Sequence, residues 1–237
     1  MTRAYKEFDD ELRSIYREFN LKQLKDLEFD DKSHSDFFVS VIRKKKPFQT
    51  TNFWDYKMVY EMDFITADMK YITGMLFLLR PDINMPHISG QYIQTVEDRR
   101  YLMHTAFGLQ ATYNFWDRIG DLLWVLFPSA LAERDVYFDR VINNIGTPYN
   151  LGKNYNSLFD LYQNEVKPVL QARKETVHYF QPECKHFWGH VEDSNYETTE
   201  IRDKEKYNYA DLMFQQLNIT AKAFELTIRL IDELPDK

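Results

Sequence analysis

The sequence has a single cysteine and few of the residues that make tight turns. Cys184 is the only cysteine among 237 residues, so no intrachain disulfide can form, and we interpret the chain as a protein of the reducing cytoplasm. Seven glycines and eight prolines favour long helices over many short strands. The first residues are charged and carry no apolar signal segment, and no apolar run approaches the roughly 20 residues that cross a bilayer. The sequence therefore predicts a cytoplasmic protein without a membrane segment.

Positive charge is also in short supply, with 30 Lys and Arg against 37 Asp and Glu and a net charge of −7. An acidic chain does not attract nucleic acid at long range, which argues against a general nucleic-acid coat protein but not against a local site. Hydrophobic residues make up 44% of the chain and charged residues 28%, a balance typical of a globular protein. A Gly-rich phosphate loop, a GxSxG motif and a CxxC pair are all absent.

Apolar residues recur at alternating steps of four and three in three segments, a period that places them on one face of a helix. The three stripes are Met58, Met62, Ile65, Met69, Ile72, Leu76, Leu79; Leu102, Ala106, Leu109, Tyr113, Trp116, Gly120, Leu123, Phe127; and Ala210, Phe214, Leu217, Ala221, Phe224, Ile228, Ile231. A fourth segment runs from about residue 154 to 180, and Pro168 should kink it or start a new helix. The pattern predicts an all-α fold, an antiparallel bundle of four to five long helices.

The second stripe carries two further local signals. Thr95 and Asp98 resemble a capping box at the start of its helix. Gly108 and Gly120 lie inside the stripe, and their missing side chains allow a neighbouring helix to come close. We therefore expect the helix to begin near residue 95, to be weakened locally at both glycines, and to permit a close approach of a neighbouring helix there.

The chain shows one candidate boundary. Residues 30–52 hold Asp, Ser, Lys and Pro47, and predict a break around a short apolar piece, Phe37-Phe38-Val39. We take this break as the seam between an N-terminal helical arm, residues 1–50, packed on the body, and a helical bundle of residues 51–237.

The residue pair with the clearest chemical meaning is Arg173 and His178. Arg173 stands in the fourth stripe, in line with Leu170 and Val177, where a guanidinium needs a carboxylate, carbonyl or phosphate partner. A fixed cation beside a histidine can stabilise a phosphate and move protons around it without a metal. In a straight helix, five residues place the two side chains about 140° apart. They meet if the arginine reaches round, if the helix loosens, or across a two-fold dimer interface.

The spacing of this pair is not unique in the chain. Arg99 and His104 repeat it, beside Arg100, near the start of the second predicted helix. We interpret this second copy as a first-turn surface feature. The context of Arg173, and not the spacing alone, therefore carries the interpretation.

The fourth segment resembles the signature region of HEPN domains, which are small helical bundles. The resemblance lies in Phe159-Asp160-Leu161-Tyr162 and in Pro168-Val169-Leu170-Gln171-Ala172-Arg173-Lys174-Glu175-Thr176-Val177-His178-Tyr179. In that family an Arg is usually followed by Asn, Asp or His, and a His stands four to six positions after the Arg, late in the bundle. The segment from Ala111 to Asp121 also resembles a bundle helix of some HEPN families. Together the likeness covers roughly residues 55–232.

The resemblance implies a metal-independent endoribonuclease that needs no cofactor and is commonly dimeric, with the Arg and His of both protomers near the two-fold axis. In this chain His178 would act on the proton of the ribose 2′-OH or of the leaving oxygen, and Arg173 would stabilise charge on the phosphate. Attack by the 2′-OH would leave a cyclic phosphate and a 5′-OH. RNA, a second copy of the chain and a partner protein are the implied partners, in a role in defence or stress.

Three neighbouring residues support this prediction or qualify it. Lys174 follows Arg173 where the family usually has Asn, Asp or His; a lysine cannot accept a hydrogen bond, although it can hold a phosphate. Asn114 and Asp117 belong to a polar stripe with Gln110 and Asp121. We expect Asp117 to contact Arg173 or His178 with Asn114 in support, and the alternative is a solvated helix face.

Two other interpretations remain open. In the first, the protein is a non-catalytic helical protein-interaction module, and Arg173 is a structural cation paired with an acid such as Asp117.

In the second, His186 and His190 lie on one helical face and form a zinc site of a hydrolase with Cys184 and Glu192. Pro182 and Gly189 argue against a helix there, and favour a loop anchored by aromatic residues with no metal.

Overall fold

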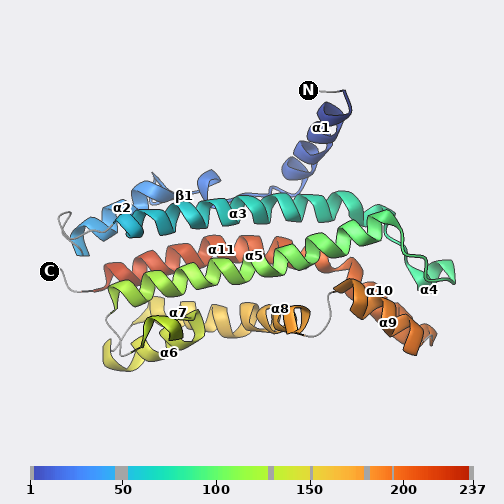
Figure 1. Ribbon diagram of the computed structural model, residues 1–237. Helices are drawn as coiled ribbons and strands as arrows, with labels where there is room; N and C mark the ends of the chain where they lie inside the picture. Colours follow the sequence, from blue (N-terminus) through green and yellow to red (C-terminus); the bar gives the residue numbers. More distant parts are fainter. Residues whose placement is uncertain are drawn as a thin grey trace. The chain divides into compact units, whose positions relative to one another are not determined.

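The computed structural model describes residues 3–45, 53–127, 131–149, 152–178, 182–193 and 195–234, without the side chains of 3–5, 53–55, 146–149 and 176–178. These residues are almost entirely helical (Figure 1), which confirms the all-α helical bundle. Strands in this part are limited to β1 (Glu28–Phe29) and β2 (Lys32–Ser33), which pair antiparallel with Phe29 opposite Lys32. None of the helices described is long and apolar enough to cross a membrane.

The four predicted long segments are all helical. The first three are α3 (Phe53–Leu79), α5 (Val96–Leu126) and α11 (Tyr209–Asp232). The fourth consists of α7 (Lys153–Leu161), a π-helical turn η5 (Tyr162–Val166) and α8 (Lys167–His178). Pro168 is the second residue of α8, a position where its missing N–H interrupts no hydrogen bond within that helix. The backbone remains helical through η5 into α8, so Pro168 follows a π-helical turn inside a continuous helical segment, and the chain does not begin a fresh helix there.

The predicted capping box of α5 is also confirmed. The backbone N–H of Asp98 donates to Oγ1 of Thr95 at 3.0 Å, and the backbone N–H of Thr95 donates to Oδ2 of Asp98 at 3.1 Å. Each side chain thus satisfies a backbone donor that the first turn of the helix would leave without a partner.

The chain forms two compact units, and each combines three separate stretches of sequence. Unit 1 consists of Met1–Leu21, Asp68–Gln110 and Val169–Leu217, and unit 2 of Lys22–Ala67, Ala111–Pro168 and Asn218–Lys237. The helices α3, α5 and α11 each contribute residues to both units. The predicted boundary at residue 50, between an arm and a body, falls outside the described residues.

Unit 1 contains α1 (Arg3–Glu18), the 3-10 turn η3 (Arg80–Asp82), α4 (Pro86–Ser89), α9 (Pro182–Glu192) and α10 (Tyr196–Tyr207), besides parts of the long helices. Gly108 of α5 packs against Met213 of α11 and Ile72 of α3. Asn84, beyond the end of α3, donates its backbone N–H to Asp98 at the start of α5. These contacts show that α3 and α5 run antiparallel in this unit, and they confirm the close approach expected at Gly108.

Unit 2 contains η1 (Leu24–Asp26), the β1–β2 pair, α2 (His34–Lys45), η4 (Glu133–Asp135) and α6 (Phe138–Tyr149). The prediction of a break over residues 30–52 was wrong for residues 34–45, which form α2. Phe37, Phe38, Val41 and Ile42 are buried, and at about 100° per residue they fall within an arc of about 140° on one side of this helix. The short apolar piece is thus part of a helical face.

The core of unit 2 is aromatic around α5. The ring of Trp116 lies 4.6 Å from that of Phe138 and 5.5 Å from that of Tyr162, and the last two rings are 4.7 Å apart. A side chain at Gly120 would meet the backbone N of Phe138 at 2.9 Å. The close approach predicted at Gly120 is therefore confirmed as well.

Candidate functional site

Arg173 lies in the middle of α8 and is half-buried, whereas Lys174, the next residue, is exposed. The guanidinium is bonded to α5: its Nε and Nη2 both donate to Oε1 of Gln110, at 3.1 and 3.0 Å. Both residues belong to unit 1. The cation predicted from the fourth stripe is therefore held in a defined orientation by a neutral amide.

Gln110 is one end of the polar stripe that the sequence places on α5. Its other end, Asp121, binds Nη1 of Arg118 at 2.6 Å, and burial raises the pKa of this carboxyl although Arg118 opposes the shift. Asn114 and Asp117 between them are half-buried and lie in unit 2. The stripe is thus half-buried, and Gln110 and Asp121 at its ends each bind an arginine, unlike residues of a solvated face. The expected contact of Asp117 with Arg173 or His178 stays a prediction.

His178 is the last residue of α8, and its side chain lies outside the described part of the structure. The backbone remains α-helical from Arg173 to His178, so the helix does not loosen between them. Five residues of a straight α-helix correspond to a rotation of about 140° between the two backbone positions. Of the three ways in which they could meet, the reach of the arginine and a two-fold interface remain.

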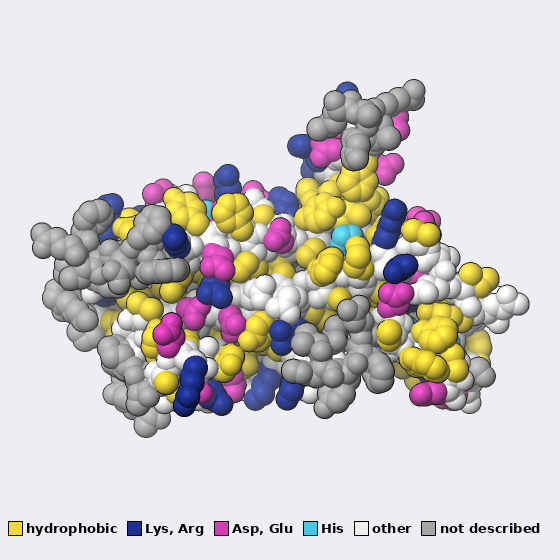
Figure 2. Space-filling view, viewed as in Figure 1, with side chains coloured by type: hydrophobic (Ala, Val, Ile, Leu, Met, Phe, Trp, Pro, Cys, Tyr) yellow, Lys and Arg dark blue, Asp and Glu magenta, His cyan; other side chains and the backbone are white. Residues whose placement is uncertain are grey.

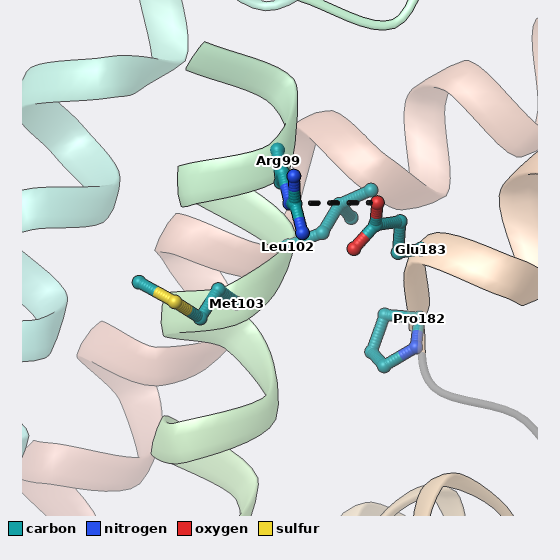
Figure 3. Close-up of a pocket in the computed structure, with 5 residues that line it drawn as sticks. All are labelled: Arg99, Leu102, Met103, Pro182 and Glu183. Carbon is teal, nitrogen blue, oxygen red and sulfur yellow. Dashed lines mark ion pairs between the residues drawn. The ribbon is translucent and has the colours of Figure 1, made fainter. Parts of the chain in front are cut away.

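The second Arg-x4-His copy lies beside a small pocket in unit 1, with a volume of about 160 Å³. The pocket is lined by Arg99, Leu102 and Met103 of α5 and by Pro182 and Glu183 of α9, and Figure 3 shows Arg99 and Leu102 beside Glu183. Nε of Arg99 lies 3.9 Å from Oε1 of Glu183, and the Arg99 side chain is 75% exposed. Arg99 is a surface residue of the first turn, as predicted, and its cation faces a carboxylate.

His104 differs from this prediction because it is half-buried. Its ring packs edge-on against Tyr71, with centroids 6.1 Å apart, and burial lowers the pKa of the imidazole, with a further contribution from Arg100. The imidazole is therefore a packed group on α5.

The sequence prediction of a loop at residues 182–192 was wrong, because this segment forms α9. Pro182 is its first residue, where a proline costs no hydrogen bond. Nε2 of His186 lies 3.3 Å from Oη of Tyr209, and Nε2 of His190 lies 3.7 Å from Oδ1 of Asp203, while Cys184 is exposed. The histidines thus have different partners, and no group of three or more His, Cys, Asp or Glu within the described residues is placed to hold a metal.

A buried polar cluster in unit 1 was not anticipated from the sequence. Asp203 of α10 is fully buried and accepts hydrogen bonds from the backbone N and from Nδ1 of His87, at 2.9 and 2.7 Å. Lys206, one turn later, is also buried; its Nζ donates to Oδ1 of Asp98 at 3.1 Å and to the carbonyl of Asn84. The cluster joins α10 to α4 and to the start of α5 through Oδ2 of Asp203 and Nζ of Lys206, which indicates a structural role. Oδ1 of Asp203 is buried and accepts no hydrogen bond among the described residues; it lies 3.7 Å from Nε2 of His190.

Large apolar side chains also reach the surface in unit 1. Phe107 and Met103 of α5 are 55% and 43% exposed, and Phe107 is three residues before Gln110. Trp188 of α9 and Ile201 of α10 are exposed as well. Figure 2 shows apolar side chains on the face drawn there, including the region where α9 and α10 lie in Figure 1. The exposed aromatic ring of Phe107 therefore lies on α5, one turn before Gln110, which binds Arg173.

No family model, curated protein or solved structure matches this chain. The interpretation of the site thus rests on its residues and their geometry.

Proposed function

We propose that this protein is a HEPN-like, metal-independent endoribonuclease in which Arg173 contacts the scissile phosphate and His178 transfers a proton. The observation that carries the proposal is the orientation of Arg173. Gln110 directs one edge of its guanidinium, and does so through an uncharged oxygen, so this contact leaves the positive charge of the arginine intact. An oriented cation of this kind stabilises the extra negative charge of a phosphate in the transition state.

The reaction is an attack of the ribose 2′-OH on the adjacent phosphorus. The 2′-oxygen forms a bond to phosphorus and loses its proton, while the bond to the 5′-oxygen breaks and that oxygen gains a proton. The products are a 2′,3′-cyclic phosphate and a 5′-OH end. An imidazole transfers such protons near neutral pH, which is the role of His178, and the exposed Lys174 adds charge for the backbone of the RNA.

Two further parts of the proposal concern partners. Because Arg173 and His178 leave a straight helix about 140° apart, a homodimer would bring His178 of the partner subunit towards Arg173 across a two-fold axis. The exposed ring of Phe107, near the Arg173–Gln110 contact, offers a surface on which an unpaired base can stack. A cytoplasmic location, a partner protein and a role in defence or stress belong to the same proposal through the HEPN resemblance.

A second candidate is a non-catalytic protein-interaction module. The half-burial of Arg173 and its bonds to Gln110 also suit a cation that joins α8 to α5, and the exposed Trp188 and Ile201 suit a surface that binds another protein. In this case Arg173 contributes to stability alone.

The experiment compares RNA cleavage by the purified full chain in EDTA with that of Arg173→Ala, His178→Ala and Arg134→Ala. Arg134 is a matched control because its side chain is 88% exposed and lies in unit 2. We expect the wild type and the Arg134→Ala control to leave cyclic-phosphate ends, and the two motif variants to be slower by at least about 100-fold.

Equal cleavage by all four proteins would point to a contaminating nuclease and refute catalysis at this motif. Absence of cleavage by the wild type would refute the enzyme and favour the interaction module.

A further inference from the structure

We infer that Gln110 is a positioning residue for Arg173, which fixes the direction in which the guanidinium meets a phosphate. The inference rests on the proposed ribonuclease function, and it assigns a role to a residue on a different helix from the motif. It begins from one contact, in which a single amide oxygen accepts two N–H groups of Arg173.

The geometry of this contact sets the plane of the guanidinium. Nε and Nη2 lie on one edge of the group, and both point to the same oxygen of Gln110. An arginine has five N–H donors in a rigid planar fork, so fixing one edge also fixes the direction of the opposite edge. Gln110 therefore decides where the remaining donors of Arg173 point.

The chemistry of the amide matters as much as its position. Glutamine accepts through its carbonyl oxygen and carries no charge, whereas a glutamate would accept in the same place and neutralise the guanidinium. A purely structural link between α8 and α5 would be served at least as well by a carboxylate. The bond to Gln110 therefore orients the arginine without itself neutralising the guanidinium.

Burial supports the same assignment. Arg173 and Gln110 are both half-buried, so that their contact is partly shielded from water, while Lys174 beside them and Phe107 one turn along α5 are exposed. An RNA strand reaching Arg173 would thus meet an oriented cation, a second positive charge and an aromatic ring within neighbouring turns of two helices.

The test uses the full chain with Gln110→Met, Gln110→Glu and the control Gln163→Met. Gln163 also accepts a hydrogen bond from a cation, since Nζ of Lys167 donates to its Oε1 at 2.9 Å, but it lies in unit 2. Two quantities are measured: the NMR signal of the Arg173 Nε–H group, assigned by its loss in Arg173→Lys, and kcat and KM for cleavage of a single-stranded RNA in EDTA.

In Gln110→Met we expect the Arg173 signal to weaken through faster exchange with water, and kcat to fall about 10- to 100-fold because the cation is misplaced. In Gln110→Glu the signal should persist, while KM rises about tenfold because a carboxylate competes with phosphate. The Gln163→Met control should match the wild type in both measurements.

Wild-type cleavage rates in both Gln110 variants would overturn the inference and leave the ribonuclease proposal standing. An unchanged Arg173 signal in Gln110→Met would also overturn it. If the wild type itself fails to cleave RNA, the proposed function falls and the inference falls with it, so the two failures are distinguishable.

Discussion

At the scale of single residues, several polar side chains that the local sequence suggests are exposed are in fact buried. Asp203 and Lys206 belong to a run of charged residues in α10, yet both are buried. His186 is 2% exposed although it follows a lysine and an exposed cysteine. Local composition does not reveal these cases, because the partners that satisfy them come from other elements.

His186 gives a prediction of pH dependence. Burial lowers the pKa of its imidazole from 6.5 to about 4, against a smaller opposing effect of Glu205. The unfolded chain therefore takes up this proton near pH 6.5 while the folded protein stays neutral, so stability falls as the pH drops from 6.5 towards 4. Between pH 7 and pH 5, we expect the wild type to lose about 2 kcal/mol more free energy of unfolding than His186→Gln.

Urea unfolding of both proteins at several pH values measures this difference. The two curves should run in parallel above pH 7, where the histidine is neutral in both states. Parallel curves down to pH 5 would show that His186 does not remain neutral in the folded protein.

At the scale of elements, close packing depends on what faces each glycine of α5. A side chain at Gly120 would collide with backbone atoms of Phe138, at 2.9 Å from N and 3.0 Å from Cα. At Gly108 the nearest atom is the sulfur of Met213, at the end of a flexible side chain. The same substitution should therefore have different costs at the two positions.

We expect Gly120→Ala to lower the free energy of unfolding by about 1–3 kcal/mol, because the start of α6 must shift. Gly108→Ala should cost less, since Met213 can move and alanine favours a helix by about 1 kcal/mol over glycine. Thermal unfolding followed by circular dichroism ranks the two variants. A melting temperature of Gly120→Ala at or above that of Gly108→Ala would contradict this view of α6 packing.

At the scale of the whole molecule, several helices contribute residues to both compact units, among them the three long ones. α3, α5 and α11 each contribute to unit 1 and to unit 2, so the loss of one unit leaves helices of the other with frayed ends. We therefore expect the units to unfold together, although each has its own core.

This expectation can be tested by weakening unit 1 alone with Lys206→Met. The change leaves the buried Asp98 carboxylate without its cation and should cost about 3 kcal/mol, whereas Lys204→Met on the same helix removes an exposed pair with Glu200 and should cost about 1 kcal/mol or less. Hydrogen exchange at increasing urea, read on peptides of α10 and of α6, should show both units losing protection at the same lowered concentration. Loss of protection in α10 alone would show that the units unfold independently.

At the candidate site, the sequence predicted the environment of Arg173 but not the residue that binds it. The apolar period placed Arg173 on a packed face of a helix, and the structure confirms that this arginine is half-buried against α5. The same period on α5 pointed to a polar stripe, and the structure shows that Gln110 of this stripe binds Arg173, while the expected contact of Asp117 stays a prediction. A polar stripe that spans residues 110–121 does not by itself indicate which turn of α5 meets α8.

By itself, the sequence determined the all-α fold, the four long helical segments and the capping box at Thr95 and Asp98. These features depend on interactions between residues a few positions apart, or on the period of one helix, and a linear pattern records both. Only the tertiary structure decided that Gln110 binds Arg173, that Asp203 and Lys206 are buried, and that residues 34–45 and 182–192 are helical. Those outcomes depend on which helices pack together and on which of their turns are in contact. The local sequence pattern of one helix does not specify these contacts.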